Sequence, residues 1–239
     1  MNAQYAAAYP ELYRNHWWWR VREEILLQRI RELLVGVPAP RMLDVGCGAG
    51  LFFDALAKFG YVEGIESDCT AIENAGHWRS RITPGELNAS FRPSAPFDLI
   101  LMLDVLEHVP EPESLLRRAS EALTPAGRVL ITVPAFNWLW TAHDELNHHV
   151  RRYTASELRN TIATAGLVTR ETRYFFQSLV IPKLATRCRE ALTSATPTVP
   201  TIPPAAVNQW VQAWFRLEYS IAGWLPFGGS LLAVAAQRL

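Results

Sequence analysis

Largely apolar runs alternate with longer amphipathic segments between residues 41 and 177. Runs of about four to eight apolar residues bounded by turn residues are typical of buried strands. In the segments between these runs, apolar residues recur at helical spacing. The runs lie at 41–45, 61–66, 97–103, 128–131 and 169–176. Strands that alternate with helices join through right-handed crossovers into a mainly parallel sheet. The pattern therefore predicts an α/β core over residues 41–177.

Residues 1–40 predict a helix outside this core. Apolar residues recur at helical spacing from a start near Pro10 or His16, and the Val-Pro-Ala-Pro segment at 37–40 ends the helix. Trp17–Trp19 is a run of three indoles that point about 100° apart on a helix, so at least one must face a pocket or another segment. Packing against the domain is one explanation, and an N-terminal lid over a bound ligand is the other.

Residues 178–229 predict a helical insertion ahead of a last strand at 230–239. Helices are expected at 179–192 and 205–223, joined by a linker that prolines stiffen. In the second helix, Glu218 falls within an expected apolar face, where a carboxylate needs an arginine partner or a substrate contact. We expect that face to consist of Val207, Trp210, Val211, Trp214, Phe215 and Ile221. The insertion could cap a site, lie on a membrane or form a homodimer.

Composition excludes several classes of protein. Lys plus Arg and Asp plus Glu number 23 each, so no basic excess favours a nucleic-acid partner. The three cysteines lack metal-ligand spacing and fit a reducing compartment. The start at Met1–Gln4 shows no signal-peptide pattern, and Ile221–Ala236 is too short and interrupted to span a membrane. We expect a cytoplasmic location.

The most informative segment is 41–50, Arg-Met-Leu-Asp-Val-Gly-Cys-Gly-Ala-Gly, where a strand runs into glycines at alternate positions. Gly46, Gly48 and Gly50 can adopt turn conformations that other residues resist, and they allow a ligand to approach the main chain. Dinucleotide enzymes use a related pattern that needs a glycine where this chain has Leu51. The segment therefore predicts a nucleoside-binding turn of a different kind.

The segment 41–50 resembles motif I of the class I S-adenosylmethionine-dependent methyltransferases, and four later segments fit the same family in order. They are Gly64-Ile65-Glu66, Gly85-Glu86-Leu87, the strand and turn at 97–109, and the turn and strand at 123–131. The resemblance implies a Rossmann-like fold: a seven-stranded, mainly parallel sheet whose last strand is antiparallel. It also implies S-adenosylmethionine as the cofactor.

The resemblance assigns roles within the cofactor site. Glu66 would accept hydrogen bonds from the ribose hydroxyls, Glu86 would meet the adenine amino group, and His108 would shape the pocket wall. The cofactor-binding residues expected in this way are Asp44, Gly46, Cys47, Gly48, Gly50, Glu66, Ser67, Glu86, Leu87, Leu103, Asp104 and His108.

Residues 134–153 concentrate histidines, acids, arginines and tryptophans beyond the end of a strand, where open α/β sheets bind ligands. We predict His143 as a general base oriented by Asp144, with His148 as the second candidate. The expected substrate contacts are Trp18, Trp19, Trp140, His149, Arg151, Arg152 and Tyr153. Asp144, His148 and His149 could also bind a divalent metal, but no spacing enforces it and no metal is predicted. The segment resembles a stretch common in methyltransferases of the ubiquinone-biosynthesis type.

These observations predict transfer of a methyl group to an oxygen atom of a small-molecule acceptor. Trp17–Trp19 and the helical insertion would enclose an apolar part of the acceptor, while Arg151 and Arg152 would meet a polar or anionic part. Nitrogen and carbon acceptors remain open. The rival classes are a nicotinamide oxidoreductase, which Leu51 and the lack of a Tyr-x-x-x-Lys pair disfavour, and a protein that binds the cofactor without turnover.

Overall fold

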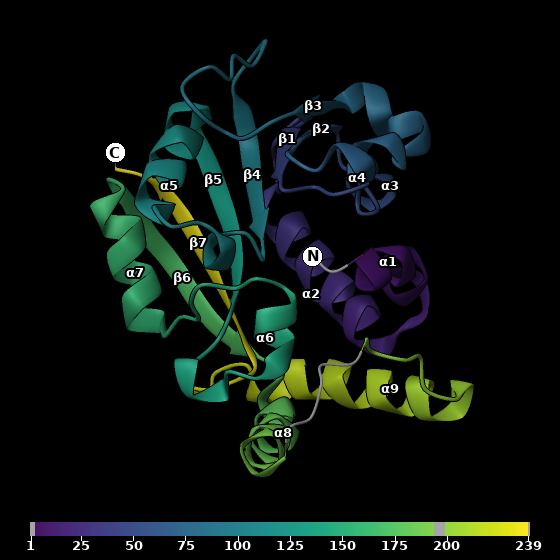
Figure 1. Cartoon of the computed structure of the whole chain (residues 1–239). Helices are drawn as coiled ribbons and strands as arrows, with labels where there is room; N and C mark the ends of the chain where they lie inside the picture. The colour runs from purple at the N-terminus through teal and green to yellow at the C-terminus, as the bar shows by residue number, and fades with distance from the viewer. Residues whose placement is uncertain (1–2, 194–198, 239) are drawn as a thin grey trace.

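A seven-stranded sheet forms the centre of the computed structural model, which describes residues 3–193 and 199–238 (Figure 1). Met1, Asn2, residues 194–198, with Pro197 of the predicted linker, and Leu239 lie outside the described residues. The strand order is β3-β2-β1-β4-β5-β7-β6, and β7 is antiparallel to both of its neighbours while the other pairs are parallel. The strands are β1 (Arg41–Val45), β2 (Tyr61–Glu66), β3 (Ile82–Pro84), β4 (Phe97–Leu103), β5 (Leu123–Pro134), β6 (Leu167–Phe175) and β7 (Ser230–Gln237). The predicted fold class is confirmed.

Helices cover both faces of this sheet. The α-helices are α1 (Ala3–Asn15), α2 (Trp17–Leu33), α3 (Phe53–Leu56), α4 (Cys69–Glu73), α5 (Pro112–Glu121), α6 (Ala142–Leu146), α7 (Ala155–Thr164), α8 (Val180–Leu192) and α9 (Ala205–Ala222). Short 3₁₀ turns lie at Gly76–Arg81, Leu106–His108, Asn137–Leu139 and Gln177–Leu179.

Alternation along the strands produces two hydrophobic cores, because successive strand residues point to opposite faces. Leu43 and Ile100 belong to the core that includes α5 and α7, whereas Met42 and Leu101 belong to the core that includes α2 and α9. Parallel strands buried on both faces bring the carboxyl ends of β1, β2 and β4 to the same edge of the sheet. The α2 helix passes close to that edge (Figure 1).

The N-terminal segment forms two helices where one was predicted. Pro10 lies inside α1, and His16 caps α2 by accepting a hydrogen bond from the Trp18 amide at Nδ1 over 3.1 Å. Asn208 of α9 fixes the same junction, since its side chain accepts from the Trp17 amide and donates to the Asn15 carbonyl, each at 2.8 Å. The first 40 residues are therefore tied to α9, which follows them by almost 200 positions.

The predicted apolar face of α9 is buried only in part, at Val211 and Phe215. The side that packs against α2 carries Asn208, Val211, Phe215, Glu218 and Tyr219, of which all but the partly buried Val211 are buried. The adjoining side exposes Val207, Trp210, Trp214, Leu217 and Ile221. The apolar residues of this helix span an arc of roughly 160° at about 100° per residue. A single neighbouring helix covers only part of that arc, so apolar residues remain on the surface.

Glu218 does not have the arginine partner that its position predicted. Its Oε2 accepts a hydrogen bond from the Ser178 amide at 2.7 Å, and no partner is seen for Oε1 in the described part of the chain. The backbone amide satisfies part of the carboxylate's hydrogen-bonding capacity, which is the requirement that the sequence identified. The contact joins α9 to the 3₁₀ turn after β6.

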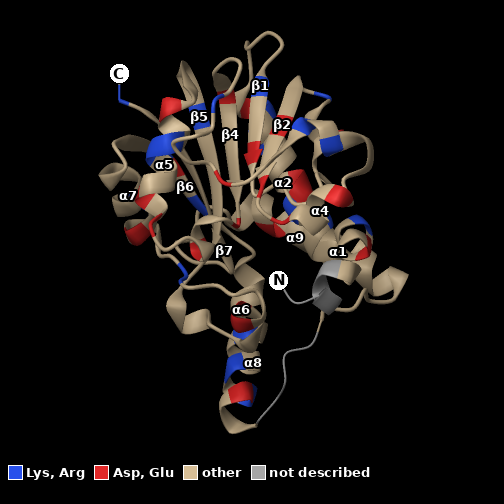
Figure 2. Ribbon diagram, turned by 45° about the horizontal axis from the view of Figure 1, so that its top comes forward, with Lys and Arg blue, Asp and Glu red and all other residues tan. Residues whose placement is uncertain are grey.

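The C-terminal region ends as predicted, with α9 stopping at Ala222 and a buried strand from Ser230. Among the described helices, none is long and apolar enough to cross a membrane. In the view of Figure 2, Lys and Arg residues are interspersed with Asp and Glu over the same elements, including α8, which extends away from the sheet.

Candidate active site

Three glycines build a bare turn at the carboxyl end of β1. Gly46, Gly48 and Gly50 have φ values of 72°, 56° and 66°, in the left-handed region that other residues adopt only at a cost. A side-chain carbon added at Gly48 would meet no atom within 4 Å, so open space borders the main chain there. A ligand can therefore approach the peptide groups of this turn directly.

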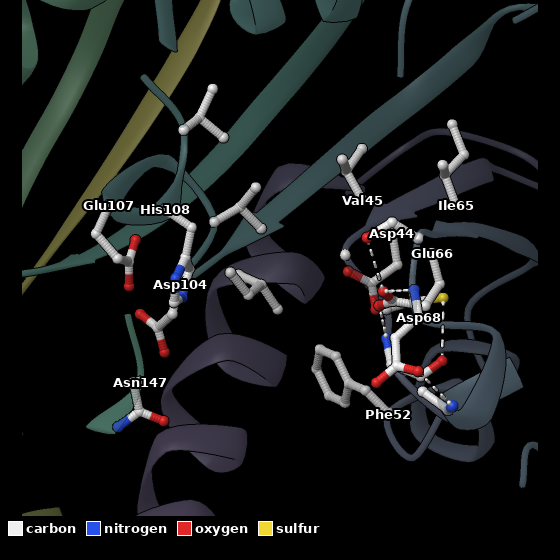
Figure 3. A pocket seen from close by; sticks show the side chains of 18 of the residues that line it. Asp44, Val45, Phe52, Ile65, Glu66, Asp68, Asp104, Glu107, His108 and Asn147 are labelled. Carbon is white, nitrogen blue, oxygen red and sulfur yellow. Dashed lines mark hydrogen bonds between the residues drawn. The ribbon is translucent and has the colours of Figure 1, made fainter. Parts of the chain in front are cut away.

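Glu66, the last residue of β2, holds the turn in place (Figure 3). Its Oε2 accepts a hydrogen bond from the Gly48 amide at 2.7 Å, and its Oε1 accepts one from the Asp68 amide at 2.8 Å. Each carboxylate oxygen has more than one acceptor site, so the group can still bind a diol while it fixes the turn.

Asp44 lies beneath the turn as a buried carboxylate. Burial raises the pKa of Asp44 to about 7, with a further increase from Glu66, while Arg22 opposes the increase. At neutral pH this group is poised between its neutral and charged forms. A cationic ligand beside it would favour the charged form.

An ion pair joins α2 to the end of β4. Arg22 of α2 contacts the Asp104 carboxylate at 2.7 Å and donates to the Thr132 hydroxyl at 3.0 Å. Asp104 itself has a φ of 60°, so the chain turns sharply where it leaves the strand. Sequence reasoning missed Arg22, although its position one helical turn after Trp18 placed it on the same face as a predicted substrate contact.

The segment after β5 is organised around Asp144, whose side chain is fully buried. Arg152 donates to both carboxylate oxygens, from Nε to Oδ1 at 2.8 Å and from Nη2 to Oδ2 at 2.7 Å. The Thr141 amide donates to Oδ2, and the Nδ1 atom of His149 lies 2.8 Å from Oδ1. Although burial opposes ionisation, His149 and Arg152 hold the pKa of Asp144 well below its usual value.

The expected pairing of His143 with Asp144 is therefore corrected. Asp144 orients His149 instead, and the Nε2 atom of His143 lies 3.1 Å from the side-chain nitrogen of Asn147. The reason is the short α6 helix: Asp144 is its N3 residue and turns inward to complete a capping box with Thr141, while His143 remains open to the cavity.

Lys183 and Arg152 shift the pKa values of groups in this region. Burial, and then Arg152, lower the pKa of Lys183 on α8 to about 8. The surrounding protein atoms and then Lys183 lower the pKa of His143 below its ordinary value, so the imidazole is neutral at pH 7. Lys183 was not among the predicted site residues, because a lysine in an amphipathic helix carries no distinguishing signal.

A cavity of about 1750 Å³ connects the glycine turn with the segment after β5. Small-molecule pockets are typically about 300–1,000 Å³, so this one has room for two ligands. It is lined by His143, Asp144 and His148, by Trp18, Trp19, His149 and Arg152, and by every predicted cofactor residue except Gly50. Side chains from both ends of the cavity appear in Figure 3.

Four predicted residues lie outside this lining. Gly50 is buried behind the turn against Phe53, and Trp140 does not border the cavity. Arg151 donates to the Pro110 carbonyl at 2.9 Å, and Tyr153 is a core residue whose hydroxyl donates to the Leu106 carbonyl at 3.3 Å. Arg152 borders the cavity, but its guanidinium is committed to Asp144 and to the Ala135 carbonyl. Arg152 therefore holds the loop to Asp144, and Arg151 does not border the cavity.

A family model described as a methyltransferase domain matches residues 17–172, more than half of the chain. The chain belongs to the methyltransferase domain family. It is thus an enzyme of the S-adenosylmethionine-dependent class I group, and S-adenosylmethionine is its cofactor, as the sequence motifs predicted.

Relatives of this methyltransferase include ubiquinone biosynthesis O-methyltransferases. The protein of that name from Paracidovorax citrulli is 27% identical over 194 residues, which cover 74% of this chain and 76% of the relative. The one from Azoarcus is 31% identical over 134 residues, 49% of this chain and 57% of the relative. For that second relative, the similarity spans little more than half of its length.

Solved structures share the fold of this methyltransferase at low sequence identity. An S-adenosylmethionine-dependent methyltransferase from Mesorhizobium loti has a TM-score of 0.57 at 18% identity, covering 87% of this chain and 95% of the other. Magnesium protoporphyrin IX methyltransferase from Synechocystis, solved with bound SAH, has a TM-score of 0.54 at 13% identity, covering 92% and 85%. The [4+2]-cyclase SpnF has a TM-score of 0.57 at 18% identity, covering 90% and 82%.

Substitution of Asp144 by Asn should destabilise the folded enzyme by about 3–5 kcal/mol, because Arg152 would remain buried without its anion. The pKa of Asp144 is lowered in the folded state, so its contribution is complete above about pH 4 and shrinks as the pH falls further. Urea unfolding at pH 7 and at acidic pH measures both effects.

The matched control is Glu121→Gln, which removes an exposed ion pair with Arg118. That change should cost at most about 0.5 kcal/mol. Equal losses from the two substitutions would contradict the structural role assigned to Asp144.

Proposed function

We propose that this enzyme transfers the methyl group of S-adenosylmethionine to a hydroxyl of a small, partly apolar metabolite. The observation that carries the proposal is the shared cavity, in which a nucleoside-binding turn and a cluster of titratable side chains border one continuous volume. A donor at one end and an acceptor at the other would meet within it. The resemblance to O-methyltransferases supports oxygen as the acceptor atom.

The donor is assigned to the end formed by β1 and β2. Its ribose would lie on Glu66, which keeps acceptor capacity beyond its two amide contacts. The adenine would lie near Glu86 and Leu87, and the cationic methionine part near Asp44, all of which border the cavity. The bare main chain at Gly48 allows this close approach.

The acceptor is assigned to the space between α2, α6 and α8. Trp18 and Trp19 supply apolar surface, while His143, His148 and Lys183 supply polar groups on the other side. An aromatic or prenylated phenol has both characters. Such a molecule would enter from the side of α8 and α9, whose exposed apolar residues could contact a membrane or a second copy of the chain.

Methyl transfer from a sulfonium is an in-line displacement, so positioning of the two reactants contributes most of the rate enhancement. The acceptor oxygen forms a bond to the methyl carbon as the carbon–sulfur bond breaks, and sulfur keeps that electron pair. The hydroxyl proton must go to a base. We assign this role to His143, because its side chain borders the cavity at the acceptor end and a neutral imidazole can accept a proton.

The direct test is incubation of the enzyme with radiolabelled S-adenosylmethionine and a panel of phenols, catechols, amines and carbon acids. Labelled ether products are expected. Glu66→Gln should weaken binding of the donor by roughly tenfold or more, because a charge-assisted hydrogen bond is lost. Glu73→Gln, an exposed acid on the same side of the sheet, is the control. Labelled amines or carbon acids, or donor binding with no labelled product, would overturn the oxygen assignment.

Binding of S-adenosylmethionine should become tighter as the pH rises through about 7. A cationic ligand prefers ionised Asp44, whose pKa of about 7 leaves the group mostly protonated at pH 6. Affinity should be roughly tenfold lower at pH 6 than at pH 8. Titration calorimetry in buffers of different ionisation enthalpy would also detect proton release. Asp44→Asn should abolish the dependence, and a pH-independent wild type would exclude this role.

Replacement of His143 by Ala should reduce kcat for a hydroxyl acceptor by about 100-fold, since a positioned general base contributes that much. The affinity for S-adenosylmethionine should change little. His77→Ala, on the exposed 3₁₀ turn outside the cavity, serves as the control. If kcat is unaltered in the His143 variant, another group removes the proton.

A further inference from the structure

Glu107 is a fully buried acid, and no hydrogen-bond partner is seen for either carboxylate oxygen in the described residues. An unpaired buried acid of this kind is costly, so a structure that retains one needs an explanation. A cation bound to its oxygens would provide one.

Two imidazoles adjoin this carboxylate. Glu107, His108 and His149 can each offer one ligand atom, and the three atoms lie within 4.8 Å of one another. The two rings are 4.8 Å apart between centroids and nearly perpendicular. Figure 3 shows Glu107 and His108 at one end of the pocket, opposite Asp44 and Glu66.

The contact between His149 and Asp144 decides which nitrogen of the His149 ring is available to bind a metal ion. Its Nδ1 atom lies 2.8 Å from Oδ1 of Asp144, a carboxylate that is also paired with Arg152 and therefore accepts a hydrogen bond from a proton-bearing Nδ1. The lone pair of the neutral ring is then on Nε2. A carboxylate behind a histidine is the arrangement that fixes the tautomer of metal-bound imidazoles.

Main-chain hydrogen bonds hold the three side chains together before any ligand binds. The Val150 amide donates to the Glu107 carbonyl at 2.8 Å, and the His149 amide donates to the Asp144 carbonyl at 2.9 Å. The His108 amide donates to the Val105 carbonyl at 3.0 Å. The loop after α6 and the turn after β4 are therefore connected at the cluster.

We propose that Glu107, His108 and His149 bind one divalent transition-metal ion. Two imidazole nitrogens and one carboxylate suit Zn²⁺, Fe²⁺, Co²⁺ or Mn²⁺ better than Mg²⁺ or Ca²⁺, which prefer oxygen ligands alone. Asp144 orients His149 and does not itself bind the ion, in contrast to the Asp144, His148 and His149 grouping that the sequence allowed. His149, predicted to contact substrate, becomes a metal ligand.

The consequence for catalysis rests on the proposed function. Three protein ligands leave coordination positions open toward the cavity, where an acceptor hydroxyl could bind. The ion would lower the pKa of that hydroxyl, whose proton passes to the neutral His143 imidazole. The oxygen then forms the bond to the methyl carbon, and sulfur leaves with the electrons of the carbon–sulfur bond.

Metal binding is tested on the enzyme freed of metal by a chelator, without S-adenosylmethionine. Calorimetric titration with Zn²⁺ and Mn²⁺ should find one site per chain, and Co²⁺ should produce a ligand-field absorption spectrum. Glu107→Gln and His149→Ala should weaken binding by about 100-fold or more, because even the loss of an outer-shell partner costs 10–100-fold. His77→Ala, outside the cavity, should bind metal as the wild type does.

Circular dichroism and S-adenosylmethionine binding establish that each variant is folded. A folded wild type without a stoichiometric site, or variants that retain full affinity and the Co²⁺ spectrum, would overturn the proposal. Because metal binding and methyl transfer are measured separately, absence of the ion would leave the proposed function standing. An enzyme that binds one metal ion per chain but methylates no acceptor would contradict the proposed function and leave the metal site standing.

Discussion

The left-handed bends at Gly46, Gly48 and Gly50 are the constraint on which the site depends. They turn the chain back at the end of β1 without placing a side chain in the cavity, and Glu66 fixes the middle of the turn through its hydrogen bond to the Gly48 amide. Parallel pairing of β1 with β2 and β4 places Glu66 and Asp104 beside the same turn. One carboxylate therefore stabilises the turn and borders the cavity.

A second network organises the opposite end of the cavity. Asp144 brings together Arg152, His149 and the cap of α6, of which Arg152 is eight residues away from it in sequence. Asp144, Arg152 and Thr141 are buried and His149 is partly buried, so each member depends on the others for compensation of its desolvation. The Arg22–Asp104 ion pair couples α2 to β4 between the two ends. Asp104 and Asp144 at this cavity thus have their cationic partners already in place.

Sequence reasoning identified the fold because its evidence was local and repeated. Strand runs and the glycine turn depend on spacing along the chain, and the structure confirms both of them. The cofactor residues were assigned by the family resemblance, and all of them except Gly50 border the cavity.

The misassigned residues depend on tertiary partners that spacing does not reveal. The apolar arc of α9 is wider than the contact surface that α2 offers, so the buried side could not be read from the periodicity. The Glu218 carboxylate accepts a hydrogen bond from a backbone amide, whereas an arginine partner was expected. Arg152 and Tyr153 looked like substrate contacts because they follow a histidine-rich loop, but their side chains fold inward. Arg22, Lys183 and the unpaired oxygens of Glu107 become informative only when burial is known.

The central claim is that the crevice beside Gly48 and Glu66 holds the adenosyl part of the cofactor, and a crystal structure with S-adenosylhomocysteine measures this most directly. The account predicts ribose density against the Glu66 carboxylate, with the sulfur directed toward His143 and the α6 loop. Density for the ligand elsewhere, with this crevice filled by protein side chains, would contradict it.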